Sequence, residues 1–503
     1  MKPSLLICCF LVGSFSFGQV TFEKNYSDGN HDRAYRILQC ADNGYIILGR
    51  SQNIFSNYST YLVRTDSLGD TVWCNSYSSI QDPTSITKTN DGGFILIGGS
   101  NVYQLIVLKL DLNGNTTWQQ QYNLSNLYTR ATVIVQAADN NYFITGYQDI
   151  SAGNRDIFLL KLNPLGQLTW NKKFGDAGFD EATDMKVTND NGFIIAGTSQ
   201  VYYQGPYQLY VLKINSAGNQ VWAQKYSQGT RAFSVDLTYD SGYIVMGHGP
   251  MFLMKIGSLG EFKWKKQLNG YSGKCVVETT DKGYFATGDV FYLAKTDSAG
   301  NILWEKNLGS QLYGFSNDCI QTVDNGLAVI GYYDDQIIGK ETIKLIKTDD
   351  EGCVEPFIKQ IIGPQNNTVS VPSEFNVKLN YGTDSLTFYW SSNNGQILSG
   401  QDSSKVNVLW NQTGTDTLTV IVSNGCGIDT TAHPVNILLC AQPLIDSIHG
   451  NAVSHFLTEN YFVNKLEGTE PIVYNWTSDI ANVIYGNGTN SVTVEWLYNG
   501  TGY

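Results

Sequence analysis

The chain is poor in positive charge and has no long apolar run after its N-terminus. Its 503 residues include 32 lysines and arginines against 45 aspartates and glutamates, and charged residues make up only 15% of it. Such a chain lacks the basic surface that neutralises phosphates, which excludes nucleic acid as the expected partner. No later apolar run approaches the length of a membrane span, so we expect no transmembrane segment.

The residue patterns of common catalytic and metal centres are also missing. The five histidines form no His-Glu-x-x-His or other close metal-binding spacing. No Gly-x-Ser-x-Gly elbow or Walker A loop occurs, and "GHGPMF" at Gly247 lacks the third glycine of a dinucleotide loop. The sequence therefore offers no catalytic residue, and an enzyme is the less favoured interpretation.

The first 18 residues have the three parts of a secretory signal peptide. Lys2 supplies the charge, residues 5–12 are apolar, and the small residues Ser16 and Gly18 precede a cleavage site before Gln19. The apolar stretch is too short to span a membrane. We therefore expect a protein that is secreted or held at the cell surface.

An Asp-x-Gly or Asp-x-Asn element, followed by an apolar run and a glycine, returns every 41 to 51 residues. Such dipeptides supply the positive-φ positions of a tight hairpin, and the apolar run after each indicates a buried strand. The copies begin at Asp42, Asp91, Asp139, Asp190, Asp240, Asp281 and Asp324.

A second hairpin follows each copy of the first. Its first strand reaches a cation, its turn holds a glycine, and its second strand brings a tryptophan. The cations are Arg64, Lys109, Lys161, Lys213, Lys255, Lys295 and Lys347; the glycines are Gly69, Gly114, Gly166, Gly218, Gly260, Gly300 and Gly352; the tryptophans are Trp73, Trp118, Trp170, Trp222, Trp264 and Trp304.

Each unit therefore holds four short strands. Four strands repeated seven times predict an all-β fold, with a seven-bladed β-propeller over residues 19–355. The tryptophans would fill the space between adjacent blades. An open solenoid of hairpins is the alternative.

The seventh unit lacks its last strand and its tryptophan. The chain after the signal peptide opens with "VTFEKNYSDGNHDRA", which aligns with "LTWNKKFGDAGFDEA" at Leu168 and places Phe22 opposite Trp170. The N-terminal strand is therefore expected to complete blade seven, with Phe22 in the tryptophan position. Closure of this kind would remove free sheet edges.

The last third carries a longer repeat. "CVEPFIKQIIGP" at Cys353 returns as "CAQPLIDSIHGN" at Cys440, and Trp390 returns as Trp476. This spacing, with alternating strands and a central tryptophan, predicts immunoglobulin-like β-sandwiches. They are expected at residues 356–439 and 440–503, the second one incomplete because it stops before its last strands.

Seven cysteines remain after the signal peptide, an odd number for an exported protein. Cys353 and Cys426 bracket the first sandwich, which favours a disulfide between them. Truncation would leave Cys440 without its partner. A chain in which all thiols are free and buried is the alternative.

The repeats resemble a known group of proteins. Units such as "DGGFILIGGS" at Asp91, each followed by a Lys–Gly–Trp hairpin, resemble the propellers of secreted surface proteins that Gram-negative bacteria export by type IX secretion. The segment "FYWSSNNGQILSG" at Phe388 resembles a PKD-like domain, an immunoglobulin-like module common in them. The resemblance implies cell-surface binding or adhesion, PKD-like spacers, and attachment to the envelope through a C-terminal region not present here.

The longest loops between the second and third strands carry aromatic residues. Tyrosines beside amides and carboxylates can stack on sugars or contact a protein, so an extracellular glycan or protein is the expected ligand. Alternatively, these side chains only cover the blade edges. The candidate ligand residues are Phe55, Tyr58, Tyr202, Tyr203, Tyr207, Tyr332, Tyr333 and Asp334.

One loop, "GDAGFDEATD" at Gly175, concentrates carboxylates. Oxygen-rich loops suit Ca²⁺, which is the one cofactor that the sequence suggests. Aspartates in turns also cap backbone amides, which is the alternative. The candidate calcium ligands are Asp176, Asp180, Glu181 and Asp184.

Two enzyme classes stay open. A propeller hydrolase or lyase for extracellular polysaccharide would place convergent carboxylates with shifted pKa values at the channel mouth. A quinoprotein-like dehydrogenase is less favoured, because in the repeats of those enzymes a similar Asp-x-x-Gly-x-x-x-Trp motif mainly docks blades. The residues expected near the channel mouth have mixed signs, which favours a ring of paired charges; they are Asp32, Asp82, Arg130, Asp180, Arg231, Lys274 and Asp318.

Overall fold

The computed structural model describes residues 19–100, 104–124, 127–201, 205–308, 314–335, 339–381, 385–439, 444–449, 458–467, 474–477, 481–485 and 488–496. Within these residues every element of regular secondary structure is a β-strand, which confirms the all-β prediction. No helix in the described part of the chain has the length and apolar character needed to cross a membrane. The chain divides into two compact units, Met1–Glu355 and Pro356–Tyr503.

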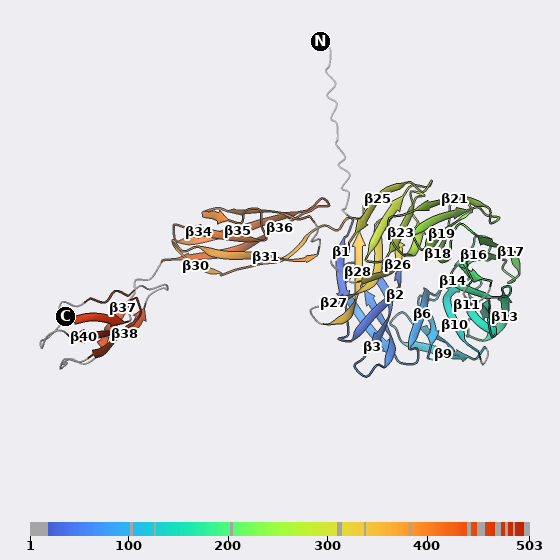
Figure 1. Ribbon diagram of the computed structural model, residues 1–503, viewed down its shortest axis with the longest axis horizontal. Coiled ribbons are helices and arrows are strands. Elements are labelled where there is room, and N and C mark those ends of the chain that lie inside the picture. The colour runs from blue at the N-terminus through green and yellow to red at the C-terminus, as the bar shows by residue number, and fades with distance from the viewer. Residues whose placement is uncertain are drawn as a thin grey trace, which may run out of the picture. The chain divides into compact units, whose positions relative to one another are not determined.

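The first unit consists of four-stranded antiparallel sheets arranged around a common centre (Figure 1). We number them in chain order. Sheet 1 holds β2 (His31–Gln39), β3 (Tyr45–Gln52), β4 (Tyr58–Thr65) and β5 (Thr71–Tyr77); sheet 2 holds β6 (Asp82–Lys88), β7 (Phe94–Gly99), β8 (Leu105–Leu110) and β9 (Thr116–Tyr122); sheet 3 holds β10 (Thr129–Gln136), β11 (Tyr142–Ser151), β12 (Asn154–Leu162) and β13 (Leu168–Phe174).

The numbering continues around the unit in the same way. Sheet 4 holds β14 (Phe179–Val187), β15 (Phe193–Gln200), β16 (Tyr207–Ile214) and β17 (Gln220–Tyr226); sheet 5 holds β18 (Arg231–Leu237), β19 (Tyr243–His248), β20 (Phe252–Ile256) and β21 (Phe262–Gln267); sheet 6 holds β22 (Gly273–Glu278), β23 (Tyr284–Gly288), β24 (Tyr292–Thr296) and β25 (Ile302–Asn307); sheet 7 holds β26 (Gly314–Gln321), β27 (Leu327–Asp335), β28 (Lys340–Thr348) and β1 (Phe22–Tyr26). Sheets 3 and 4 are joined by one parallel pair, Arg155 with Phe179.

The first strand of every sheet lies innermost. Each of these strands contacts the first strand of the next sheet, and β26 contacts β2, so the innermost strands close into a ring. The second and third strands, such as β15 and β8, are buried along almost their whole length because neighbouring sheets cover both of their faces. Twisted four-stranded sheets packed face to face around a ring form a β-propeller.

The N-terminal strand β1 completes sheet 7, as the sequence predicts. It pairs antiparallel with β28 and places Phe22 opposite Lys347. In sheet 2 the same register places Trp118 opposite Lys109. Phe22 thus occupies the tryptophan position, where it is 1% exposed.

Each tryptophan packs on the turn glycine of the next sheet. A Cβ atom on Gly218 would lie 2.6 Å from the Trp170 ring, and one on Gly69 would lie 2.5 Å from Phe22. These glycines also have positive φ angles, 78° at Gly218 and 77° at Gly69. Two independent constraints, backbone conformation and ring packing, therefore select glycine here.

A tyrosine four residues after the aromatic anchor holds the same turn. The hydroxyl of Tyr26 donates to the carbonyl oxygen of Gly69 at 2.7 Å, and that of Tyr226 donates to Gly260 at 2.6 Å. Sheet 3 has Phe174 at this position, which has no hydroxyl to donate.

The repeated cations and aspartates form ion pairs at one end of the ring. In sheet 4 the Lys213 ammonium donates to Asp190 at 2.8 Å, and its side chain is 7% exposed. Burial raises the pKa of Asp190, but hydrogen bonds from Lys213 and Thr188 outweigh burial and bring the pKa to about 2. The seven pairs are Arg64–Asp42, Lys109–Asp91, Lys161–Asp139, Lys213–Asp190, Lys255–Asp240, Lys295–Asp281 and Lys347–Asp324.

The second unit begins with two four-stranded sheets that share one core. Trp390 and Trp410 are fully buried in it, and the Trp410 indole donates to Asp416 at 2.7 Å. One sheet holds β29 (Phe357–Ile362), β31 (Ser373–Tyr381), β34 (Lys405–Trp410) and β33 (Gly395–Ser399); the other holds β30 (Asn366–Thr368), β36 (Ile428–Leu438), β35 (Gly414–Ser423) and β32 (Thr387–Ser392).

A further four-stranded sheet follows in the second unit. Val492 and Val494 are buried in it, and Trp476 packs against them. Its strands, in order across the sheet, are β37 (Leu444–His449), β38 (Thr458–Glu467), β40 (Ser491–Trp496) and β39 (Ala481–Tyr485).

The cysteines fall into two groups. Cys40, Cys74, Cys275 and Cys319 have free thiols, and three of them are buried. Cys353 and Cys426 are each disulfide-bonded. The pairing of Cys353 with Cys426 stays a prediction, and Cys440 lies outside the described residues.

Candidate functional site

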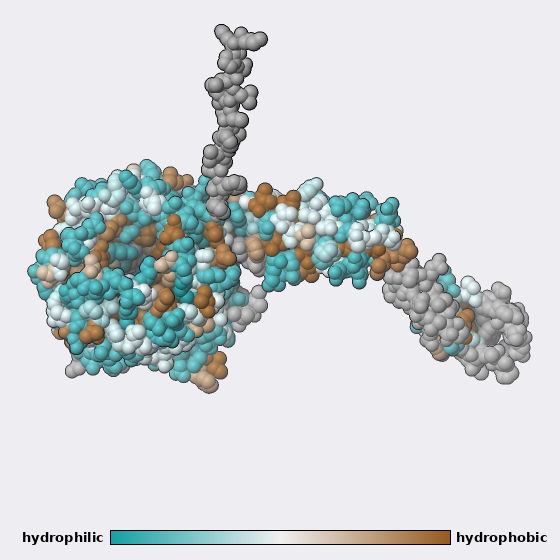
Figure 2. Space-filling view, turned by 180° about the vertical axis from the view of Figure 1, so that it is seen from behind, coloured by the Kyte–Doolittle hydropathy of each residue, from teal (hydrophilic) through white to brown (hydrophobic). Residues whose placement is uncertain are grey.

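The two ends of the propeller ring are built differently. We call the end formed by the turns of the two hairpins in each sheet the turn face; it carries the seven Lys/Arg–Asp pairs described above. The opposite end, the loop face, is formed by the loops between second and third strands and by the connections from one sheet to the next. Figure 2 shows hydrophobic residues scattered among hydrophilic ones on the propeller surface, without one large apolar patch in that view.

Arginine is concentrated on the loop face. The chain has seven arginines, all within the first 231 residues. One belongs to the turn-face pairs, and Arg36 lies inside the ring on β2, where it pairs with Asp318 at 3.6 Å. The other five stand at strand ends on the loop face: Arg33, Arg50, Arg130, Arg155 and Arg231.

Four of these arginines lie over tyrosine rings. The guanidinium of Arg231 lies 3.8 Å from the ring centre of Tyr207, and that of Arg50 lies 4.5 Å from Tyr58. Arg33 lies over Tyr332, and Arg155 lies over both Tyr128 and Tyr147. Stacking holds each guanidinium plane in a fixed direction, which limits the entropy lost when its N–H groups bind a ligand.

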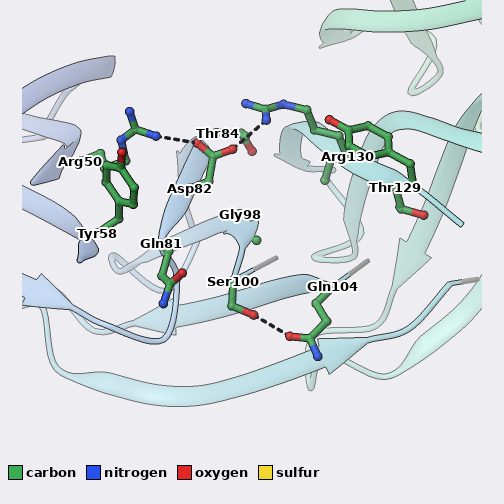
Figure 3. Close-up of a pocket in the computed structure, with 13 residues that line it drawn as sticks. Arg50, Tyr58, Gln81, Asp82, Thr84, Gly98, Ser100, Gln104, Thr129 and Arg130 are labelled. Carbon is green, nitrogen blue, oxygen red and sulfur yellow. Dashed lines mark hydrogen bonds and ion pairs between the residues drawn. The ribbon is translucent and has the colours of Figure 1, made fainter. Parts of the chain in front are cut away.

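Three of the charged side chains meet in one pocket above sheet 2, which we call the Asp82 pocket (Figure 3). Asp82, on β6, accepts a hydrogen bond from Arg130 Nη1 at 2.7 Å, and Arg50 Nη1 lies 3.4 Å from its other oxygen. The pocket has a volume of about 240 Å³. Gln81, Thr84, Ser100, Gln104 and Tyr128 supply polar groups to its wall.

A second, more open pocket lies where sheets 7 and 1 meet. Arg33 forms a two-pronged ion pair with Glu341, both distances being 2.6 Å. Ile54 and Ser56 on the β3–β4 loop and Asp334 at the end of β27 line the same pocket. Its volume is about 470 Å³.

The aromatic residues predicted from the sequence do not form one cluster. Tyr58 lines the Asp82 pocket, whereas Phe55, 77% exposed, lies between two residues that line the second pocket. Tyr207 is 39% exposed and stacks on Arg231 in sheets 4 and 5. Asp334 is exposed beside the second pocket.

Tyrosines 332 and 333 point to different surroundings. Tyr332 is half-buried under Arg33 on the loop face. Tyr333 is buried, and its hydroxyl donates to Asp335 at 3.4 Å, so it offers no exposed ring to a ligand. Tyr202 and Tyr203 lie outside the described residues.

The four candidate calcium ligands do not converge on one point. The carboxylate of Asp180 accepts the backbone N–H of Asp176 at 2.8 Å, which is the amide-capping arrangement. Glu181 pairs with Arg155, and Asp184 accepts the backbone N–H of Val235 at 3.0 Å. Across the described residues, no group of three or more His, Cys, Asp or Glu side chains is arranged to hold a metal ion.

The charged residues predicted near the channel mouth do not occupy equivalent positions in the innermost strands. Each innermost strand has a β-bulge, and Asp82, Arg130 and Arg231 stand two residues before it. Lys274 is the bulged residue of β22, and Asp318 follows the bulge of β26. A one-residue change of position relative to a bulge changes the direction of the side chain.

Inside the ring, carboxylates connect neighbouring sheets. Asp318 accepts the backbone N–H of Ile37 at 3.0 Å, and Asp184 accepts that of Val235. Burial lowers the pKa of Lys186, but the carboxylates of Asp184 and Asp236 outweigh burial, so its pKa is raised. These charges have partners within the ring, as expected of a structural network.

Comparisons with known proteins give a likeness of fold. No protein family model matches the chain, and no curated protein matches it. The WD40 β-propeller domain of Doa1 has 8% identity and a TM-score of 0.47, with 66% of this chain and 98% of that chain covered. Virginiamycin B lyase from Staphylococcus aureus has 10% identity, coverages of 65% and 98%, and a TM-score of 0.47. BamB from Moraxella catarrhalis has 13% identity, coverages of 65% and 99%, and a TM-score of 0.41.

The sequence pointed to Asp82 and Arg130 as residues near the channel mouth, but not to Arg50 or Arg155, nor to the pocket that Arg50, Asp82 and Arg130 share. Aromatic residues on long loops drew attention to Tyr58 and Tyr207, which are the stacking partners rather than the charged groups. One signal was available: arginine, unlike lysine, is confined to part of the chain.

Proposed function

We propose that this is a secreted or cell-surface binding or adhesion protein. Its first unit acts as a seven-bladed β-propeller whose loop face binds an extracellular glycan or protein. The immunoglobulin-like, PKD-like domains of the second unit serve as spacers, and export by type IX secretion fits the resemblance of the repeats.

The observation that carries this proposal is the difference in how the two faces use their charges. On the turn face, the cation of each pair lies within the same sheet as its aspartate, and the pair stabilises a turn. On the loop face, five arginines project between sheets, most of them over tyrosine rings and beside pockets. Tyrosine and arginine are among the residues most enriched at the binding interfaces of proteins.

An enzyme would need convergent carboxylates free to exchange protons. Asp184 and Asp318 instead accept backbone N–H groups from the next sheet. Asp82 lies between two arginines. This use of carboxylates supports binding over polysaccharide hydrolysis or lysis.

The test is a glycan and matrix-protein array probed with the full chain, with calcium and again with a chelator. Specific binding is expected, and Tyr207→Ala on the loop face should weaken it. The matched control is Leu259→Ala, which removes an 80% exposed side chain from the turn face. Binding that only the control weakens, or no binding by a folded sample, would contradict the proposal. Loss of binding with the chelator would indicate that binding depends on a metal ion, for which the acidic loop at Gly175 is the candidate site.

A further inference from the structure

The Asp82 pocket is positively charged in an acidic protein. Its lining holds two guanidinium groups, from Arg50 and Arg130, and one carboxylate, from Asp82. The other lining residues carry no charge, so the pocket has a net charge of +1, whereas the whole chain has a net charge of −13. A small anion that enters it meets an attractive local charge against a repulsive background.

Both arginines keep hydrogen-bond donors for a ligand. A guanidinium has five N–H groups in a fixed plane, and Arg130 donates to Asp82 through Nη1. Its side chain is 40% exposed. Arg50 stacks on Tyr58 and lies 3.4 Å from Asp82, a distance that indicates a weak hydrogen bond. Asp82 thus holds two guanidinium planes at the pocket wall without using all their donors.

The three charged residues come from three consecutive sheets. Arg50 stands near the end of β3 in sheet 1, Asp82 begins β6 in sheet 2, and Arg130 lies at the start of β10 in sheet 3. Rigid strands, rather than loops, therefore set the spacing between the two guanidinium groups. Planar forks fixed in this way suit the oxygens of a carboxylate or a sulfate.

The uncharged part of the lining suits a sugar. Gln81, Thr84 and Ser100 offer amide or hydroxyl groups, and Ser100 donates to Gln104 at 2.5 Å. A sugar ring presents several hydroxyls to such groups, whereas an aspartate or glutamate side chain presents none besides its carboxylate. The volume of about 240 Å³ lies below the usual range for ligand pockets, which favours a single ring over an extended chain.

We propose that the Asp82 pocket binds the carboxylate or sulfate group of an acidic sugar within an extracellular glycan. Arg130 and Arg50 hold the anionic group, Asp82 orients both arginines, and the amides and hydroxyls of the wall bind the ring. The inference deepens the proposed binding function of the loop face and rests on it.

The experiment is calorimetric titration of the full chain with a galacturonate tetrasaccharide and with its methyl ester, in which a neutral ester carrying one added methyl group replaces each carboxylate. A sulfated maltotetraose and plain maltotetraose form the second arm, which distinguishes sulfate from carboxylate. Polyglutamate tests an acidic peptide. In about 0.15 M salt, at least one anionic sugar should bind about tenfold or more tightly than its neutral counterpart.

Variants then locate the binding. Arg130→Gln should weaken binding of the anionic sugar about tenfold or more, and Arg130→Lys should weaken it less, because lysine keeps the charge but loses the planar fork. Lys263→Gln is the control, since it removes one positive charge from a side chain that is 51% exposed and lies beside the turn face, away from the pocket. It should change the affinity less than about twofold. Thermal melting of each variant checks that it is folded.

Three results would overturn the inference: equal binding of the charged and uncharged sugars, equal losses in Arg130→Gln and Lys263→Gln, or a preference for polyglutamate. If the array shows a ligand that Tyr207→Ala weakens while no anionic sugar is preferred, the proposed function stands and this inference falls. If the folded chain binds nothing in either experiment, both fall.

Discussion

The turn face and the loop face of the propeller both carry ion pairs between a cation and a carboxylate. The two faces differ in how far apart the partners lie in the sequence. On the turn face, partners lie 14 to 23 residues apart, as in Lys295–Asp281 and Lys213–Asp190, and every sheet repeats the pair. On the loop face, several partners come from different sheets: Arg130 and Asp82 are 48 residues apart, and Arg33 and Glu341 are 308 apart. Arg155 pairs both with Glu181 of the next sheet and with Asp149 of its own. The turn-face pair is repeated in every sheet, whereas the loop-face pairs differ from sheet to sheet.

This difference separates stability from recognition. A pair that recurs in all seven sheets satisfies the same local requirement seven times, namely a buried cation beside a tight turn. A cluster that occurs once, such as the Asp82 pocket, has no equivalent in the repeat and is free to suit a ligand. Substitutions should therefore affect stability on the turn face and binding on the loop face.

The largest effect on stability is expected where the ring closes. Phe22→Ala removes a fully buried ring that packs on Gly69, and should lower the free energy of unfolding by about 3–5 kcal/mol. Chemical denaturation measures the change. Val20→Ala, two residues earlier and 41% exposed, is the control and should change the free energy little. Equal effects of the two would show that β1 does not close the ring.

The second-largest effect is expected from acid, which should weaken the ion pairs of the turn face. In the folded state Asp91, Asp190 and Asp240 have pKa values of about 2, because hydrogen bonds from lysine and threonine outweigh burial, which alone would raise them. The unfolded chain, with ordinary values of about 3.9, takes up protons first, so stability is lost as the pH falls from about 5 to about 2. After screening by water, each pair is worth on the order of 1 kcal/mol. Melting temperatures that stay constant between pH 5 and pH 3 would contradict this.

Breaking one turn-face pair should lower the free energy of unfolding more than breaking one loop-face pair. Asp190→Asn leaves the buried Lys213 ammonium without its counter-charge and should cost about 1–3 kcal/mol of stability. Arg130→Gln breaks a loop-face pair whose side chains are 40% and 37% exposed, and should cost less than about 1 kcal/mol. Denaturation of both variants under one condition compares them. The reverse order would remove the distinction between the two faces.

The smallest effect concerns the tyrosine that bonds to the turn glycine of the next sheet, as Tyr226 does. Tyr226→Phe loses the hydrogen bond to Gly260 and should reduce stability by about 1 kcal/mol. The reverse change, Phe174→Tyr in sheet 3, gives a hydroxyl the chance to reach the Gly218 carbonyl and should raise the melting temperature slightly. If Phe174→Tyr lowers it, the sheet 3–sheet 4 contact differs from the others.

Repeats explain why much of the fold could be predicted. The deficit of one tryptophan and the extra N-terminal strand together place Phe22 opposite Lys347, the register found in the structure. Predictions without a repeat behind them were less successful in locating a site. The aromatic candidates lie in several places, Tyr333 is buried, and the carboxylates near Gly175 do not converge.

The sequence by itself determined the strands, the tight turns and the closing role of the first strand, because these depend on contacts that recur along the chain. Only the tertiary structure decided which loop-face residues meet. Arg50, Asp82 and Arg130 belong to three sheets, and their distances depend on how the sheets twist and where the bulges fall. Those properties arise from packing around the whole ring, and no local pattern encodes them.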